Sequence, residues 1–218
     1  QILVEEYIPG DELAIEGLLR NGKLEILAIF DKPDPLEGPY FEETLYVTPA
    51  RQTPSAQAAI IELTHQTVTA TGLTEGPIHV EVRLNPCGVW LLEIAARSIG
   101  GICSRTIHFG LGASLEELIL RHALDLPLGD IALAWPASGV MMLPIRQAGQ
   151  LKKITGQEAA FRVPGIEDIQ ITIPRGREVI PLPEGNRYLG FIFARAENAM
   201  EVELALRSAY SLLNITID

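Results

Sequence analysis

The chain has 218 residues, of which 47% are hydrophobic, and a net charge of −11 at pH 7. This length and apolar content suffice for one core or two, while the acidic charge argues against the broad basic face that a nucleic-acid-binding protein needs. No apolar run approaches the roughly 18 residues that span a bilayer, so we expect neither a membrane span nor a signal peptide, and the two cysteines, Cys87 and Cys103, indicate free thiols in a cytoplasmic protein.

The first residues predict a strand that starts at Gln1 without an initiator methionine, so we expect the chain to be a piece of a longer protein. Residues 12–19 and 23–30 have the alternating pattern of strands and flank Asn21-Gly22, one of the strongest short turn signals. This stretch therefore predicts an antiparallel hairpin.

A long irregular loop is predicted for residues 31–52, which are rich in proline and acidic residues. Loops of this length in a compact domain are often functional. Lys32, near its start, is a candidate ligand for the γ-phosphate of a nucleotide or for a carboxylate, with a solvated lysine at a strand end as the alternative. A helix then begins with Thr53 as its cap and Pro54 at its first position, and it runs to Gly72.

A second hairpin is predicted for residues 78–84 and 89–94, joined by a turn at 85–88. Because side chains alternate along a strand, one face of the first segment carries three polar residues, His79, Glu81 and Arg83. Glu81 and Glu93 lie at similar distances from the turn, which makes them cross-strand neighbours.

Two adjacent carboxylates repel each other unless a cation lies between them, and magnesium is the usual cation. Arg97, just beyond the hairpin, adds a charged fork for phosphate or carboxylate oxygens. The alternative is a solvated sheet face on which Glu81 pairs with Arg83 and Glu93 pairs with Arg97. His79 shares the face of Glu81 and is a weaker candidate.

The segment Ile2 to Glu12, ILVEEYIPGDE, together with this hairpin resembles the second lobe of the ATP-grasp family, which includes carboxylate-amine ligases, biotin carboxylase and D-alanine ligases. The resemblance implies that Glu12 binds the ribose hydroxyls of ATP and that the adenine hinge consists of Glu5, Glu6, Tyr7 and Ile8. It implies that Glu81 and Glu93 hold Mg²⁺, with Mn²⁺ as an alternative. Arg97 would steady the transferred phosphate and the acyl intermediate.

One position departs from the common family pattern Glu-x-Asn-x-Arg, because the run from Glu93 to Arg97 carries Ala95, which cannot bind a metal. Two alanines followed by Gly100-Gly101 resemble the branch of L-amino-acid ligases and dipeptide synthases. The residues from about 137 onward are similar to the small C-terminal domain of that branch.

After the glycines, residues 102–109 predict a short helix whose N-terminus suits a substrate carboxylate. The candidate substrate-binding residues are Gly100, Gly101, Arg105 and, from the hairpin, Arg83. For Arg105 the alternative is an ion pair with Glu116 or Glu117. Ser114 and Glu117 predict a capping box for a helix that reaches Leu124.

The rest of the chain predicts a connector at 125–136 and a small α+β unit. Strands are expected at 139–145, 150–154, 169–173 and 188–194, with one helix capped by Thr155 and Glu158 and another, 199–213, capped by Asn198 and Glu201. We interpret this unit as a scaffold or lid contact and leave a homo-oligomer open. The predicted fold class is α+β, with the ATP-grasp C-terminal lobe, an antiparallel sheet with helices, at residues 1–127 and the small α+β domain at 128–218.

The function that the resemblance implies is ATP-dependent ligation of small-molecule carboxylate and amine substrates through an acyl phosphate. No glycine-rich phosphate loop appears in these residues, so we expect it in a missing N-terminal part and expect no turnover by this chain alone. Two alternatives stay open: a carboxylase of the biotin carboxylase type and a non-catalytic nucleotide-binding module.

Overall fold

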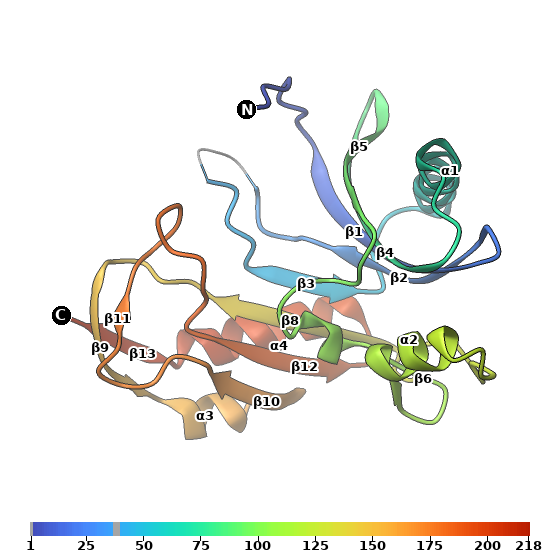
Figure 1. The fold of residues 1–218 in the computed structure, drawn as a ribbon. Coiled ribbons are helices and arrows are strands. Elements are labelled where there is room, and N and C mark those ends of the chain that lie inside the picture. The colour runs from blue at the N-terminus through green and yellow to red at the C-terminus, as the bar shows by residue number, and fades with distance from the viewer. Residues whose placement is uncertain (1, 37–39) are drawn as a thin grey trace.

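The computed structural model describes residues 2–36 and 40–218 and contains a large antiparallel sheet. Its eight strands lie in the order β10-β12-β8-β3-β2-β1-β4-β5, so strands from the two halves of the chain meet in its middle (Figure 1). In chain order these strands are β1 (Asp11–Arg20), β2 (Lys23–Asp31), β3 (Leu45–Thr48), β4 (Gly76–Asn85), β5 (Gly88–Ala95), β8 (Ala137–Leu143), β10 (Ile166–Ile171) and β12 (Gly190–Ala196).

Two smaller sheets and the helices complete the fold. A three-stranded sheet contains β11 (Glu178–Val179), β9 (Gly149–Thr155) and β13 (Asn214–Ile217), and a two-stranded one contains β6 (His108–Phe109) and β7 (Ala113–Ser114). The helices are α1 (Pro54–Thr71), α2 (Leu115–Ala123), α3 (Gln157–Phe161), α4 (Ala199–Ser211) and the 3₁₀ helix η1 (Cys103–Thr106).

The large sheet is covered on both faces. Helices α1 and α4 pack on one face, and the segment that carries η1 and α2 packs on the other. Strand alternation sorts the side chains: in β8, Met141 and Leu143 pack toward α4, whereas Val140 and Met142 pack toward the η1 side. The sheet is therefore the middle layer of three.

The strongest local signals are confirmed. Asn21 and Gly22 take positive φ values of 51° and 75° in the turn between β1 and β2, and α1 is capped by the Thr53 hydroxyl and ends at a left-handed Gly72. The second hairpin forms as β4 and β5. Helices α2 and α4 begin as predicted, since the side chains of Ser114 and Asn198 accept the amide N–H groups of Glu117 and Glu201.

Three local predictions were wrong where tertiary contacts decide the backbone. Within the predicted loop, residues 45–48 form β3 because Leu45 and Val47 are buried in the core beneath α4. Residues 102–109 form only η1 and then β6, which pairs with β7. Residues 2–9 form no strand, while Gln1 and residues 37–39 of the predicted loop lie outside the described residues.

The cap of α3 is Gly156, so the prediction of Thr155 was also wrong. Gly156 has a φ of 87°, and a Cβ on it would lie 1.9 Å from the carbonyl oxygen of Leu212. Only glycine fits this close, left-handed position.

The large sheet crosses the predicted boundary between residues 127 and 128, because β3 is hydrogen-bonded to β8. Two side-chain contacts add to this connection, from Arg51 to Glu203 and from Arg207 to Asp34. The division into two domains stays a prediction. Within the described residues, no helix is long and apolar enough to cross a bilayer.

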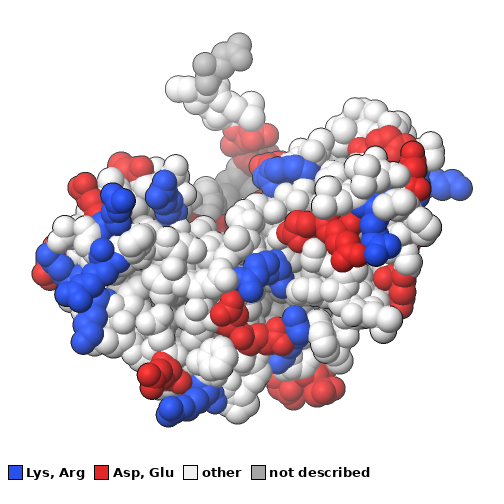
Figure 2. All heavy atoms as spheres, turned by 60° about the horizontal axis from the view of Figure 1, so that its bottom comes forward, with Lys and Arg blue, Asp and Glu red and all other residues white. Residues whose placement is uncertain are grey.

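Acidic and basic side chains are mixed over the surface that Figure 2 shows, where blue and red spheres alternate among larger white areas. Such mixing keeps local fields small on this face.

Candidate functional site

Glu81 and Glu93 are direct cross-strand partners in the register of β4 and β5, as the sequence predicted. Cross-strand partners point to the same face of a sheet, so their carboxylates share one side. Glu93 is 59% exposed and pairs with Arg97 at 3.9 Å, a surface contact that contributes little stability. Glu81 does not pair with Arg83; its carboxylate contacts Lys32 and His79 instead.

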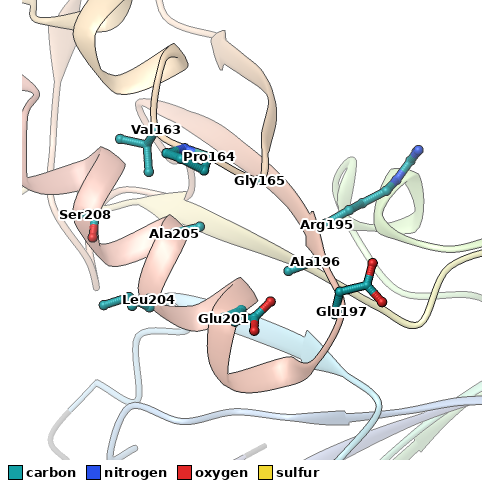
Figure 3. Close-up of a pocket in the computed structure, with 10 residues that line it drawn as sticks. All are labelled: Val163, Pro164, Gly165, Arg195, Ala196, Glu197, Glu201, Leu204, Ala205 and Ser208. Atoms are coloured by element: carbon teal, nitrogen blue, oxygen red, sulfur yellow. The ribbon is translucent and has the colours of Figure 1, made fainter.

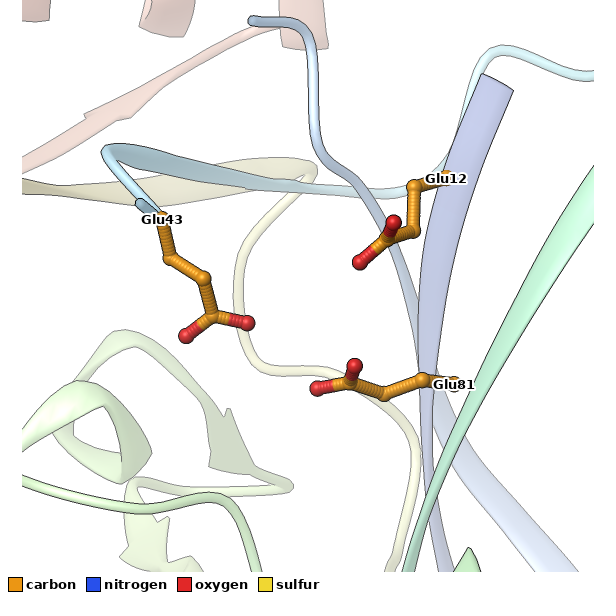
Figure 4. A group of neighbouring side chains, drawn as sticks. All are labelled: Glu12, Glu43 and Glu81. Carbon is orange, nitrogen blue, oxygen red and sulfur yellow. The ribbon is translucent and has the colours of Figure 1, made fainter. Parts of the chain in front are cut away.

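Lys32 is the centre of a buried cluster of carboxylates. Its side chain is 2% exposed, and its Nζ lies 2.8 Å from Glu12, 2.7 Å from Glu43 and 3.1 Å from Glu81. Figure 4 shows the three carboxylates converging from separate parts of the chain, and their oxygens lie within 4.8 Å of one another. The alternative of a solvated lysine is therefore wrong.

The charges in this cluster set its protonation. Burial alone would lower the pKa of Lys32, but the surrounding carboxylates outweigh it and raise that pKa. For the acid Glu81, burial alone would raise the pKa, but the hydrogen bond to His79 and the charge of Lys32 lower it to about 2. Both groups are ionised at neutral pH, so the cluster resembles a cation site that is filled by an ammonium group.

His79 lies between two carboxylates. Its Nδ1 contacts Glu16, and its Nε2 lies 3.1 Å from Glu81. Because a neutral imidazole can donate only one N–H, contact with a carboxyl group at each ring nitrogen favours the imidazolium form. Burial opposes this form, but the hydrogen bonds and charges of Glu16 and Glu81 raise the pKa of His79 to about 9.

Arg83 is hydrogen-bonded to three parts of the chain: the segment before β1, β1 itself and the loop after β2. It donates from Nε to Glu12 at 2.9 Å, from Nη1 to the Ile8 carbonyl at 2.6 Å and from Nη2 to the Leu36 carbonyl at 2.7 Å. The ring of Tyr7 packs over its guanidinium at 5.0 Å. Arg83 thus holds the predicted adenine hinge in place, and its predicted role in substrate binding stays a prediction.

The remaining hinge candidates, Glu5 and Glu6, are exposed in front of β1, and Glu12 is held between Lys32 and Arg83. Their predicted contacts with adenine and ribose stay predictions. The geometry shows only that the backbone at Ile8 and the carboxylate of Glu12 are fixed by the same arginine.

A cavity of about 210 Å³ opens beside this cluster. The predicted residues Glu81, Arg97, Gly100 and Gly101 line it, together with aromatic and apolar side chains that include Tyr46, Tyr188 and Phe191. Arg105 lies elsewhere: it pairs with Asp168 at 3.1 Å and packs over the ring of Phe193, so the alternative partners Glu116 and Glu117 were wrong.

The comparisons with known proteins agree with this geometry. Residues 1–106 match the family model of the ATP-grasp domain. This part of the chain is an ATP-grasp domain. Residues 141–218 match a second model, that of the L-amino acid ligase C-terminal domain 2, in agreement with the resemblance noted for the tail.

Three comparisons show which proteins the chain is similar to. The L-arginine-specific L-amino acid ligase of Bacillus subtilis is 26% identical over 225 residues, which cover 100% of the chain and 53% of the ligase. Carnosine synthase 1 of Gallus gallus is 34% identical over 126 residues, covering 58% of the chain and 13% of the synthase. The crystal structure of the L-amino acid ligase from Bacillus licheniformis has a TM-score of 0.83 and 28% identity, over 97% of the chain and 53% of that protein.

The chain thus spans about half the length of the L-amino acid ligases that it matches. Among solved structures under 25% identical, N5-carboxyaminoimidazole ribonucleotide synthetase from Thermotoga maritima has a TM-score of 0.74 and shows the same fold. The predicted α+β class and the antiparallel sheet of the ATP-grasp fold are confirmed.

The donor set fits the divalent cation that ATP-grasp ligases use. Around the cluster, the four carboxyl groups of Glu12, Glu16, Glu43 and Glu81 face the three cationic groups of Lys32, His79 and Arg83. Glu93, opposite Glu81, adds a fifth carboxyl group, which lies 3.9 Å from Arg97. Two ionised carboxylates on one sheet face offer the oxygen ligands that hard cations prefer.

Glu16, Glu43 and Tyr46 are residues of this site that the sequence analysis did not select. Glu16 stands with Glu12 on one face of β1, and their spacing in an apolar strand was a usable signal. Glu43 and Tyr46 had none, because they reach Lys32 only through the path of the loop before β3.

A larger hollow of about 480 Å³ lies in the second half of the chain, between α4, the end of β12 and residues 163–165. Figure 3 shows residues that line it, with Leu204 and Ala205 from α4, Arg195 from β12 and Glu197 directly after β12. It contains none of the predicted site residues. The smaller cavity beside Glu81 is the better candidate because the charged cluster and the predicted residues meet there.

Proposed function

We propose that the protein to which this chain belongs is an ATP-dependent ligase that joins a small carboxylic acid to an amine, forming an amide or peptide bond. The observation that carries the proposal is the register of Glu81 and Glu93 beside the cavity that Arg97 lines. The L-amino acid ligases and carnosine synthase among its relatives support this class of reaction.

The reaction proceeds in two steps. The substrate carboxylate attacks the γ-phosphorus of ATP, the bond to the bridging oxygen breaks, and an acyl phosphate and ADP are formed. The amine then attacks the acyl carbon, phosphate leaves with the electrons of the C–O bond, and the nitrogen loses a proton. Catalysis of this kind depends on positioning and on neutralising charge rather than on a protein nucleophile.

The residues of this chain have distinct tasks in that reaction. Glu81 and Glu93 would hold Mg²⁺, or Mn²⁺ in its place, and the ion would neutralise phosphate charge. Arg97, which is more than half exposed at the cavity, contacts the transferred phosphate and the oxyanion. The backbone at Gly100 and Gly101 lets the substrate carboxylate approach closely, since a glycine presents no side chain there.

The amine is held at Glu43. This residue lines the cavity with its side chain one-third exposed, and its carboxylate contacts Lys32. A partly buried carboxylate is a good partner for an ammonium group, and the rings of Tyr46 and Tyr188 limit the space around it. An amino acid as the amine substrate fits this chemistry.

Calorimetric titration of the full-length protein with Mg·ADP tests the proposal. We expect binding in the wild type and a loss of affinity of about 10-fold or more in Glu93→Gln, because one of two charged metal ligands becomes neutral. Arg97→Ala should lower kcat and leave the affinity for ADP nearly unchanged, since its contact develops in the transition state. Unchanged kcat in Arg97→Ala would overturn this role.

A non-catalytic nucleotide-binding module is the second candidate, because Ala95 stands where many relatives of the fold carry a metal-binding asparagine. Such a module binds Mg·ADP but forms no product from any carboxylate and amine pair. Product formation coupled to release of phosphate decides between the two.

A further inference from the structure

Glu16 is the most deeply buried carboxylate of the charged cluster. It lies in β1 and is 1% exposed, and both of its oxygens have a partner: Oε1 contacts His79, and Oε2 accepts the backbone N–H of Ile99 at 3.1 Å. A buried carboxylate is costly unless it is paired and hydrogen-bonded. These two partners therefore fix where Glu16 lies.

The surroundings of Glu16 leave it little other contact. Its neighbours on the same face of β1, Ala14 and Leu18, belong to the apolar cluster between the sheet and η1. Burial raises the pKa of Glu16, and its partners only partly oppose this effect. An apolar side chain would fit such a position at lower cost, so the carboxylate calls for an explanation beyond packing.

The two partners of Glu16 lead to the two halves of the proposed site. His79 is its cross-strand partner on β4, and the other ring nitrogen of His79 lies 3.1 Å from the metal ligand Glu81. Ile99 stands two residues after Arg97 and directly before Gly100. The carboxylate of Glu16 thus contacts both the histidine that reaches the metal ligand and the loop that carries the phosphate-binding arginine.

We propose that Glu16 is a positioning residue, which holds Glu81 through His79 and holds the loop of Arg97, Gly100 and Gly101 through the Ile99 amide. This inference rests on the proposed function, because it takes Glu81 as a metal ligand. Groups behind a ligand commonly change metal affinity by 10-fold to 100-fold when they are lost.

The two contacts of Glu16, with His79 and with the Ile99 amide, predict different effects in different variants. In Glu16→Gln, one of the two N–H donors faces an amide NH₂ group in place of an oxygen, and the other donates to a neutral oxygen in place of a charged one. Both contacts are therefore weakened. In His79→Asn, the shorter side chain reaches only the position of Nδ1, so the contact with Glu81 is lost and the loop contact of Glu16 remains. In His79→Gln, the amide reaches the position of Nε2 and keeps the contact with Glu81.

The test uses the full-length protein and Mn²⁺ as the probe, with free Mn²⁺ followed by electron paramagnetic resonance in the presence of ADP. We expect Glu16→Gln and His79→Asn to weaken Mn²⁺ binding by about 10-fold or more, with a smaller loss in His79→Gln. In addition, Glu16→Gln should lower kcat further than His79→Asn, because only the former loosens the Arg97 loop.

The matched control is His122→Asn. His122 is also a buried histidine, but its Nε2 contacts the carbonyl of Leu19, at the end of β1 away from Glu12. This variant should lower Tm and leave Mn²⁺ affinity within twofold. A purely structural role of Glu16 and His79 would give the same pattern as this control.

The outcomes separate the two proposals. If Glu81→Gln leaves Mn²⁺ affinity unchanged, the proposed function fails. If affinity depends on Glu81 but stays within twofold in both Glu16→Gln and His79→Asn, the positioning role is wrong. Should Glu16→Gln fail to fold, a Mn²⁺ affinity of His79→Asn within twofold of the wild type would overturn the proposal by itself.

Discussion

At the scale of single residues, Lys32 shows how partners fix a role that the residue type leaves open. Its ammonium group is buried and faces three carboxylates, one from β1, one from β4 and one from the loop before β3. A lysine in this position neutralises carboxylates that would otherwise repel one another. It therefore stabilises the site.

We expect Lys32→Met to lower the free energy of unfolding by about 3 to 5 kcal/mol, since removal of one partner leaves the buried carboxylates without their cation. Urea denaturation followed by circular dichroism measures this loss. Lys152→Met is the control, because Lys152 is 42% exposed, and its effect should stay within about 0.5 kcal/mol. Equal stabilities of the two variants would contradict a stabilising role of the contacts between Lys32 and the three carboxylates.

The two cysteines should differ sharply in reactivity. Cys87 is exposed in the turn between β4 and β5, whereas Cys103 is buried beside the cavity. Burial, with the nearby charges of Glu43 and Glu16, raises the pKa of the Cys103 thiol to about 12, so almost no thiolate forms at pH 8. A disulfide-exchange reagent should modify one thiol of this chain quickly in the native state and both after denaturation, and Cys87→Ser should abolish the fast reaction.

Candidate site residues could be predicted from the sequence where their positions follow from the alternation of side chains along a strand. They could not be predicted where their positions depend on the path of the chain between strands. Glu81 and Glu93 followed from alternation and from their distances to one turn. Glu43 contacts Lys32 only because β3 enters the sheet beside β2, and local composition does not encode that neighbour. For the same reason the solvated and buried states of Lys32 were indistinguishable in the sequence.

At the scale of elements, α4 illustrates how one helix divides its side chains between core and solvent. Leu206 is 0% exposed in the core beneath the sheet, whereas Leu204, two residues away, is 66% exposed. This spacing places the two leucines on different faces of the helix. The same substitution therefore has different costs at the two positions.

Leu206→Ala should destabilise the protein by about 2 to 5 kcal/mol, through lost burial and the cavity that remains. Leu204→Ala should change stability by less than about 0.5 kcal/mol, because its side chain is mostly in solvent. Thermal and urea unfolding of the two variants give the comparison directly. A similar loss in both would mean that the outer face of α4 is covered in solution.

Element ends were predictable where a side chain makes the cap and unpredictable where the backbone does. Thr53, Ser114 and Asn198 each accept an amide N–H as their sequence context indicated. Gly156 caps α3 because the carbonyl of Leu212, far along the chain, leaves no room for a side chain. A threonine beside a glycine gives no sign of that contact.

At the scale of the whole molecule, the large sheet joins the two parts that the sequence predicted as separate domains. Strand β3 pairs with β8 over four residues but with β2 through a single pair, Asp31 and Val47. The apolar cluster on the η1 side also mixes both parts, since Phe30 and Tyr46 pack with Val140, Met142 and Phe191. The two parts therefore share a core.

This shared core predicts that the intact chain unfolds in a single transition and that a chain cut after residue 127 does not fold stably. The cut removes the main partner of β3 and exposes the apolar cluster around Tyr46. Residues 128–218 keep their cluster beneath α4 apart from Leu45 and Val47, so this piece should retain more structure than the first. Near- and far-ultraviolet circular dichroism should give coincident urea transitions for the intact chain, and two separate transitions, or a folded piece 1–127, would show that the boundary divides independent domains.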